Sequence, residues 1–98
     1  MPHFVCLFDW TDQGSKTVTD TVDRVGGASE MAQSKYGVHL EHIYWTVGAH
    51  DLVGVLEAPD VESLSAFLLE LAKAGNIRST TMRAFDQDEM SSIIGRVG

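Results

Sequence analysis

The residues of this chain that could carry chemistry are concentrated around His42, where polar and apolar residues alternate. Alternate residues of an extended strand point to the same face of a sheet, so His42, Tyr44 and Thr46 share one face. Histidine exchanges a proton near neutral pH and can serve as a general acid or base. We therefore single out His42 as the candidate catalytic residue, and Tyr44 and Thr46 as candidate substrate-binding residues.

The same side chains admit a purely structural interpretation. Polar groups buried in an interface must find hydrogen-bond partners whether or not they do chemistry. His42 and Tyr44 could bond to each other or to the backbone where two copies of the chain meet. Both interpretations stay open, and the structural one is slightly favoured for His42.

His50 and Asp51 follow closely but do not form a predicted catalytic pair, because adjacent residues of a strand point to opposite faces. The sequence Gly48-Ala49-His50-Asp51 is typical of a tight turn between two strands. In such a turn Gly48 supplies a positive φ and Asp51 bonds back to the turn backbone. This interpretation leaves His50 exposed.

Four histidines and one cysteine raise the question of a metal site. His39 and His42 stand three residues apart in a predicted strand and should face opposite ways, and no C-x-x-C or H-E-x-x-H spacing occurs. We predict no metal ligands and no cofactor, although a site shared between two subunits stays open. Cys6 lies in an apolar strand, which is typical of an inert core residue rather than a nucleophile.

Composition indicates one compact domain spanning residues 1–98. Apolar residues make up 44% and charged residues 21% of the chain, as in soluble proteins, and no apolar run approaches the roughly 20 residues that span a bilayer. The formal charge of −7 disfavours nucleic acid as a partner. A lone cysteine and an N-terminal sequence without a secretory signal predict a cytoplasmic protein with no membrane association.

The hydrophobic pattern predicts strands over 4–10, 38–47, 52–58 and 77–85, and a loop or short turn over 11–20. It predicts a helix over 21–36, a second helix that Asp60 caps and Gly75 ends, and a terminal helix that opens with a capping box at Asp86 and Glu89. The order βαββαβ is that of a ferredoxin-like α+β fold, in which helices cover one face of a four-stranded antiparallel sheet.

The first and third strands are apolar on both faces, which a sheet with one solvated face does not require. Phe4, Cys6 and Phe8 lie on one face of the first strand, and Val5 and Leu7 lie on the other. A second copy's sheet is the simplest cover for the face without helices. We therefore predict a homodimer, or a multiple of it, in which two sheets pack face to face as a dimeric α+β barrel.

The barrel interior would be the place for a ligand, so the facing of each strand matters. We assign Val5 and Leu7 to the helix face, which turns Cys6, Phe8 and Trp10 toward the barrel as candidate substrate-binding residues. On the fourth strand the sequence does not decide between two alternating sets, Ser79, Thr81 and Arg83 or Arg78, Thr80 and Met82.

Three motifs closely resemble the GYD family of small bacterial proteins: Tyr44-Trp45-Thr46-Val47-Gly48, Trp10-Thr11-Asp12-Gln13-Gly14 and Gly75-Asn76-Ile77-Arg78. The chain departs from the family where Gly48, His50 and Asp51, with Ala49 inserted, replace the usual Gly-Tyr-Asp, and where Gly26-Gly27 interrupts a helix. The resemblance implies a dimeric α+β barrel whose inter-sheet space binds ligands in related barrels. It implies no particular reaction.

Two functions of different class remain. The first is a binder of a small apolar or aromatic molecule, which extends to a cofactor-free enzyme of monooxygenase, cyclase or isomerase type. The second is a non-catalytic oligomeric accessory or sensor protein whose barrel its own side chains fill. A cavity next to His42 and Tyr44 would favour the first, and packed aromatic side chains would favour the second.

Overall fold

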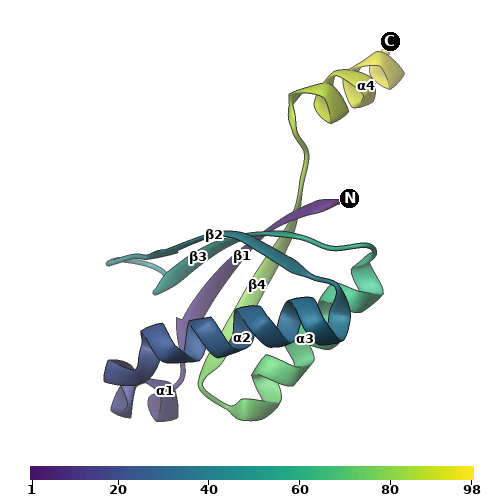
Figure 1. Cartoon of the computed structure of the whole chain (residues 1–98). Coiled ribbons are helices and arrows are strands. Elements are labelled where there is room, and N and C mark those ends of the chain that lie inside the picture. Colours follow the sequence, from purple (N-terminus) through teal and green to yellow (C-terminus); the bar gives the residue numbers. More distant parts are fainter.

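The computed structural model describes all residues of the chain, 1–98 (Figure 1). In chain order its elements are β1 (His3–Trp10), α1 (Asp12–Lys16), the 3₁₀ turn η1 (Val18–Asp20), α2 (Thr21–Tyr36), β2 (His39–Trp45), β3 (Leu52–Glu57), α3 (Val61–Ala74), β4 (Ile77–Ala84) and α4 (Gln87–Val97). The predicted strands and helices are all present, with small shifts at their ends.

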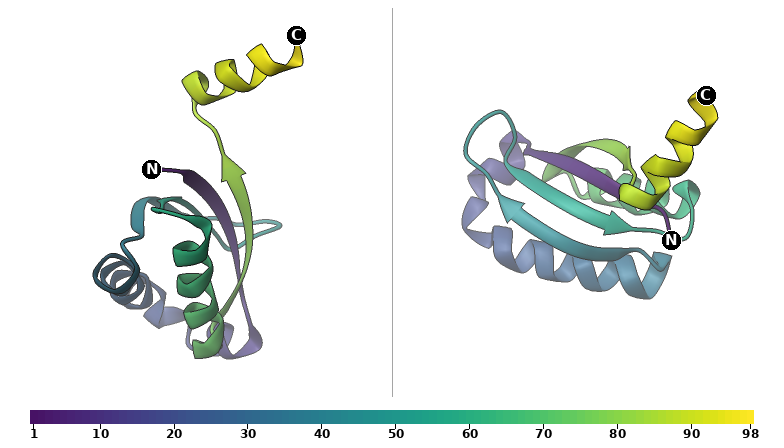
Figure 2. Two further views of the ribbon diagram at one scale, coloured as in Figure 1. Left: turned by 90° about the vertical axis from the view of Figure 1, so that its right-hand side faces the viewer. Right: turned by 90° about the horizontal axis from the view of Figure 1, so that it is seen from above.

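The four strands form one antiparallel sheet in the order β2-β3-β1-β4. Helices α2 and α3 cover one face of this sheet, and the other face is uncovered in the chain (Figures 1 and 2). The βαββαβ order with α2 and α3 on one side confirms the predicted ferredoxin-like arrangement. We call the uncovered side the open face.

Local capping chemistry sets the ends of the later helices as the sequence predicts. The Asp60 side chain accepts a hydrogen bond from the Ser63 backbone N–H at 2.7 Å, and Gly75 ends α3 with a φ of +85°. Asp86 and Glu89 form a reciprocal capping box at the start of α4. These contacts lie within a few residues of each other in sequence, which is why the pattern reveals them.

Residues 11–20 fold into α1 and η1, where the sequence predicts a loop or short turn. The Thr11 side chain caps α1 by accepting a hydrogen bond from the Gly14 N–H at 3.1 Å. A threonine followed by polar residues is a helix start that the sequence analysis missed.

The start of α1 packs tightly against the turn between α3 and β4. The Thr11 N–H donates to the Asn76 carbonyl at 3.0 Å, the Thr11 hydroxyl donates to the Gly75 carbonyl at 2.5 Å, and the Gln13 amide donates to the Ala74 carbonyl at 3.0 Å. Gly14 is buried, and a Cβ built on it would lie 2.0 Å from the Asn76 oxygen. We call this contact between residues 11–14 and 74–76 the α1 junction.

The core lies between the sheet and the two helices. Its buried side chains are Phe4, Cys6, Phe8, Ala32, Val38, Leu52, Leu56, Ala58, Leu64 and Phe67. The predicted facing of β1 is therefore wrong: Phe4, Cys6 and Phe8 point under the helices, and Val5 and Leu7 lie on the open face. The reason is the partner strand, because Gly54 stands opposite Cys6 and leaves room for the Phe8 ring, 3.2 Å from where a Gly54 Cβ would be.

The pairing of β4 with β1 resolves the facing that the sequence left undecided. Ser79, Thr81 and Arg83 stand opposite Phe8, Cys6 and Phe4, so they share the helix-covered face. The alternate set, Arg78, Thr80 and Met82, belongs to the open face.

Helix α4 lies beyond the end of the sheet and away from α2 and α3 (Figure 1 and Figure 2, left). Several of its apolar side chains are exposed, including Met90, Ile94 and Val97. None of the helices is both long enough and apolar enough to cross a membrane.

Substitution of Gly14 tests the α1 junction. Gly14→Ala should lower the free energy of unfolding by about 1–3 kcal/mol or more, because the added methyl group overlaps the Asn76 carbonyl. Gly26→Ala is the matched control: no atom lies within 4 Å of its Cβ position, so helix propensity should stabilise the chain by about 0.5–1 kcal/mol. Urea denaturation of both variants measures this, and an undisturbed Gly14→Ala would contradict the junction.

Candidate functional site

The open face carries two of the candidate residues. His42 pairs with Val55 and Tyr44 with Val53 on β3, and their rings stack with centroids 6.4 Å apart at an interplanar angle of 13°. The Tyr44 side chain is 63% exposed. This facing agrees with the sequence analysis, while the catalytic role of His42 and the binding role of Tyr44 stay predictions.

The polar groups of Thr46 are hydrogen-bonded within the turn at the end of the hairpin. Its hydroxyl donates to the His50 carbonyl at 2.5 Å, and its backbone N–H donates to the Asp51 carbonyl at 2.8 Å. The hydroxyl therefore fixes the turn, and its predicted part in substrate binding would require it to leave this bond.

The turn itself differs from expectation. His50 is half-buried rather than exposed, and its Nδ1 lies 3.1 Å from an oxygen of Asp9 on β1. The Asp51 side chain does not bond back to the turn backbone, because its carboxylate accepts from the Trp10 backbone N–H at 2.9 Å. Both acidic contacts tie the hairpin to the end of β1, and Gly48 has the predicted positive φ, +153°.

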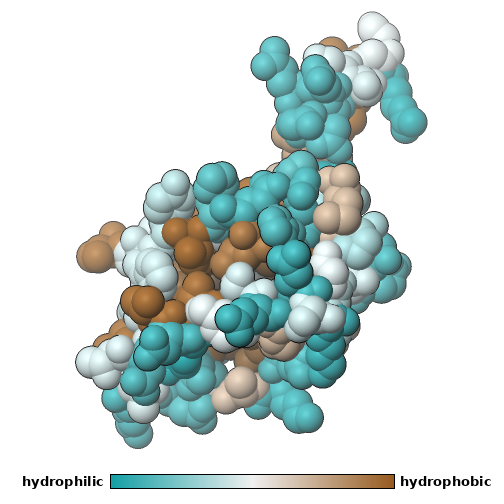
Figure 3. All heavy atoms as spheres, viewed as in Figure 1, coloured by the Kyte–Doolittle hydropathy of each residue, from teal (hydrophilic) through white to brown (hydrophobic).

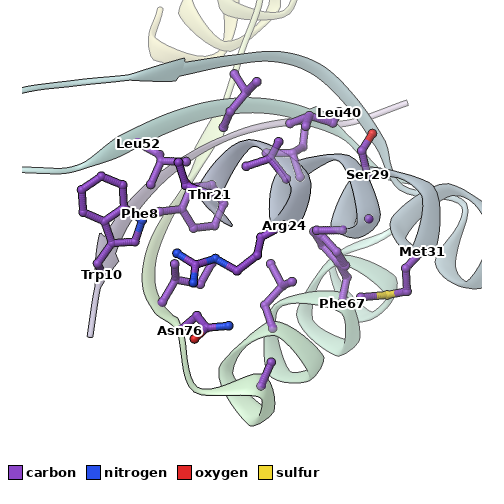
Figure 4. A pocket seen from close by; sticks show the side chains of 18 residues that line it. Phe8, Trp10, Thr21, Arg24, Ser29, Met31, Leu40, Leu52, Phe67 and Asn76 are labelled. Atoms are coloured by element: carbon purple, nitrogen blue, oxygen red, sulfur yellow. The ribbon is translucent and has the colours of Figure 1, made fainter. Parts of the chain in front are cut away.

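A cavity of about 290 Å³ lies on the other side of the sheet, between β1–β3 and helices α2 and α3 (Figure 4). Its wall is mostly apolar and includes Leu40, Ile43 and Phe67. Phe8 and Trp10 also line it, so these two candidates lie on the helix side of the sheet and not on the predicted barrel wall. In the space-filling view, apolar side chains gather where the sheet edge meets α2 (Figure 3). Neither His42 nor Tyr44 lines this cavity.

Small residues of α2 leave this space open. Gly27, Ala28 and Ser29 form the part of the wall that α2 contributes near its middle, and a Cβ at Gly27 would meet no atom within 4 Å. From the sequence alone, Gly26-Gly27 indicates only an interruption of the helix. The same glycine pair, next to small residues on a helix that packs over a sheet, was a usable signal for a void.

Cys6 does not face a barrel as predicted, because it is 0% exposed and packs in the core. Its Sγ lies 3.5 Å from the Thr81 hydroxyl, and burial raises the pKa of the thiol. Both features disfavour a thiolate at neutral pH. Its predicted place on the barrel wall is thus corrected to the helix side of the sheet.

Potential metal ligands converge at one end of the open face. The His3 Nε2 lies 3.1 Å from a carboxylate oxygen of Glu57 and 3.5 Å from one of Glu41. One ligand atom from each of the three residues lies within 4.8 Å of the other two. A β-bulge between Leu40 and His42 brings Glu41 to this place and shifts the register, so His39 and His42 pair with Glu57 and Val55, which share a face. The backbone register therefore departs from the simple alternation that predicts opposite faces, although the His39 ring turns toward α2, where its Nδ1 lies 3.0 Å from Gln33 Oε1.

A four-stranded antiparallel sheet with helices on one face and an open opposite face defines a ferredoxin-like α+β protein. The chain belongs to the GYD domain family, whose sequence profile matches residues 4–94. Two of the motifs that carry the resemblance, Trp10-Thr11-Asp12-Gln13-Gly14 and Gly75-Asn76-Ile77-Arg78, meet in the α1 junction.

A relative is the glutamine synthetase and cystathionine beta-lyase binding protein of Thermus thermophilus. It is 30% identical over 84 residues, which cover 86% of this chain and 88% of the relative.

Similar solved structures confirm the fold. MtbAldR matches with a TM-score of 0.64 at 14% identity, over 88% of this chain and 53% of that one. FFRP-DM1 matches with a TM-score of 0.57 at 20% identity, over 87% and 100%, and TTHA0845 from Thermus thermophilus with 0.54 at 23% identity, over 88% and 95%.

Burial of Cys6 predicts an unreactive thiol. In the native protein at neutral pH, Ellman's reagent should modify Cys6 at least about a hundredfold more slowly than in urea, since reaction needs both exposure and the thiolate. The unfolded protein supplies the control for reagent quality. Rapid modification of the folded chain would show that β1 opens or faces solvent.

Proposed function

We propose that this protein is a non-catalytic accessory protein that self-associates through its open face and binds a partner enzyme. The observation that carries the proposal is the relative, whose name records binding to glutamine synthetase and cystathionine beta-lyase. The match extends over most of both chains, so it does not rest on a shared fragment. Of the two functions that the sequence left open, this is the accessory interpretation.

The position of the cavity supports the same choice. An enzyme built around His42 requires a pocket beside that histidine, because a general acid or base must reach its substrate within hydrogen-bond distance. Within the chain, the cavity under α2 lies on the opposite side of the sheet from His42. A catalytic role for His42 would therefore depend on space formed with a second copy.

The composition of the open face supports self-association. Val5, Leu7, Val53 and Val55 occupy its centre on the two inner strands, while charged residues such as Glu57 and Arg78 occupy its edges. An apolar centre with a polar rim is the usual anatomy of a protein interface. We take the occupant to be a second copy, whose matching sheet completes the α+β barrel.

Helix α4 adds a second argument for assembly. An isolated helix of 11 residues is marginal in water, and packing of its apolar stripe normally supplies its stability. Helix α4 lies away from the sheet of its own chain (Figure 2), and Met90 and Ile94 of its apolar stripe are exposed. The neighbouring copy is the cover that this proposal assigns to it. A cytoplasmic location, which suits a lone free cysteine, belongs to the same proposal.

A charge on the open face should abolish self-association. Wild-type protein is expected to sediment as a dimer or a multiple of it at micromolar concentration, and Leu7→Asp as a monomer, because an unpaired buried carboxylate costs roughly several kcal/mol. Leu69→Asp is the matched control, since that leucine is 70% exposed on α3. A monomeric wild-type protein, or a dimeric Leu7→Asp variant, would contradict the proposed interface.

Binding to an enzyme is tested with purified glutamine synthetase and cystathionine β-lyase from the source organism. We expect a saturable complex with at least one of them in isothermal titration calorimetry and co-sedimentation. An unrelated acidic enzyme of similar size serves as the control for non-specific association. If neither enzyme binds while the protein is dimeric, the proposed binding of a partner enzyme is contradicted, and only the proposed self-association is supported.

A further inference from the structure

We propose that the cavity under α2 binds a small organic acid, whose apolar body fills the cavity and whose carboxylate pairs with Arg24. The inference is independent of the proposed accessory function. It rests on three properties of the cavity: its size and lining, an arginine without an acidic partner, and the absence of acidic residues from its wall.

The lining suits an apolar body. Of the 18 residues that line the cavity, 13 are hydrophobic, and they come from the sheet, α2 and α3. An apolar cavity of about 150 Å³ accepts a benzene molecule, so the 290 Å³ here suits a body about twice as large. An eight-carbon chain or a phenyl ring with a short tail falls in this range.

Arg24 supplies the charge. It lies on the first half of α2, is half-buried, and extends toward Asn76 in the cavity (Figure 4). Its guanidinium donates to the Thr17 hydroxyl at 2.7 Å and to the Gly14 carbonyl at 3.2 Å. Both acceptors are neutral, and Arg24 makes no salt bridge, although acidic residues outnumber basic ones by 14 to 7.

A guanidinium has N–H donors left after these two contacts, in a planar arrangement that matches a carboxylate. The contact to Gly14 also fixes its position, because Gly14 is held in the α1 junction. Arg24 is thus a preorganised cation at the wall of an apolar cavity, where a partly desolvated ion pair is stronger than on an open surface.

The wall also limits the ligand class. No Asp or Glu lines the cavity, so an ammonium group would have no counter-charge there. The other polar side chains on the wall are Thr21, Ser29 and Asn76, which are uncharged. The site therefore favours a simple monocarboxylate over a zwitterion and over a neutral compound of the same shape.

Octanoate and 4-phenylbutyrate are the probes, with octanamide as the neutral match and 2-aminooctanoate as the zwitterion. Isothermal titration calorimetry of the full chain should show saturable binding of one acid per chain. The amide and the zwitterion should each bind at least about tenfold more weakly, since a charge-assisted hydrogen bond is lost or an ammonium group is buried.

Two pairs of variants locate the site. Arg24→Gln should weaken octanoate binding at least about tenfold, whereas Arg96→Gln, which changes the net charge equally from exposed α4, should not. Gly27→Leu should block the cavity, whereas Gly26→Leu, one residue away and outside the wall, should bind as wild type does. Thermal melting checks that each variant is folded, and the glycine pair answers the question if Arg24→Gln does not fold.

No binding of either acid at millimolar concentration overturns the proposal. Equal binding of octanoate and octanamide overturns the assigned role of Arg24, and equal binding to Gly27→Leu and Gly26→Leu overturns the location. Weak non-saturable uptake that all variants share would mean a general apolar surface effect, which also contradicts a defined site.

Discussion

The close approach of Gly14 to the Asn76 carbonyl is the contact on which the rest of the structure depends. It lies just beyond the ladder that pairs β1 with β4, and packs the segment that follows β1 against the turn that precedes β4. Through the Gly14 carbonyl it also holds Arg24, and so the first half of α2, above the sheet. A side chain at position 14 would separate these elements, which explains why a buried glycine stands inside a short helix.

The two layers of the molecule share β1. Its even-numbered residues pack under the helices, and Phe8 and Trp10 reach the cavity, while Val5 and Leu7 lie on the open face. One strand in the middle of the sheet therefore borders both surfaces discussed above. Both the odd-numbered and the even-numbered residues of β1 are apolar because the strand borders the core on one side and the apolar open face on the other. This is unusual for an antiparallel sheet that is covered on one face only.

The sequence predicts those structural features that depend on residues close together along the chain, and not those that depend on residues far apart. The ends of α3 and α4 were predictable because Asp60, Gly75 and the Asp86–Glu89 box act within a few residues. The facing of β1 was not, because both faces are apolar and Gly54 on another strand decides between them. The contact between His50 and Asp9 joins residues far apart in sequence, and the bulge at Glu41 breaks the alternation on which strand arguments rely. The cavity needed packing information, although Gly26-Gly27 hinted at it.

Gly27 sets the stability of α2 against the volume of the cavity beside it. A glycine inside a helix costs about 1 kcal/mol relative to alanine, and here its missing side chain also leaves open space at the wall of the cavity. Selection for heat resistance alone would replace it and fill the void. Related proteins that keep glycine at this position keep space for a ligand at the expense of helix stability. The residue type at position 27 in related chains would therefore show whether ligand space or helix stability has been selected.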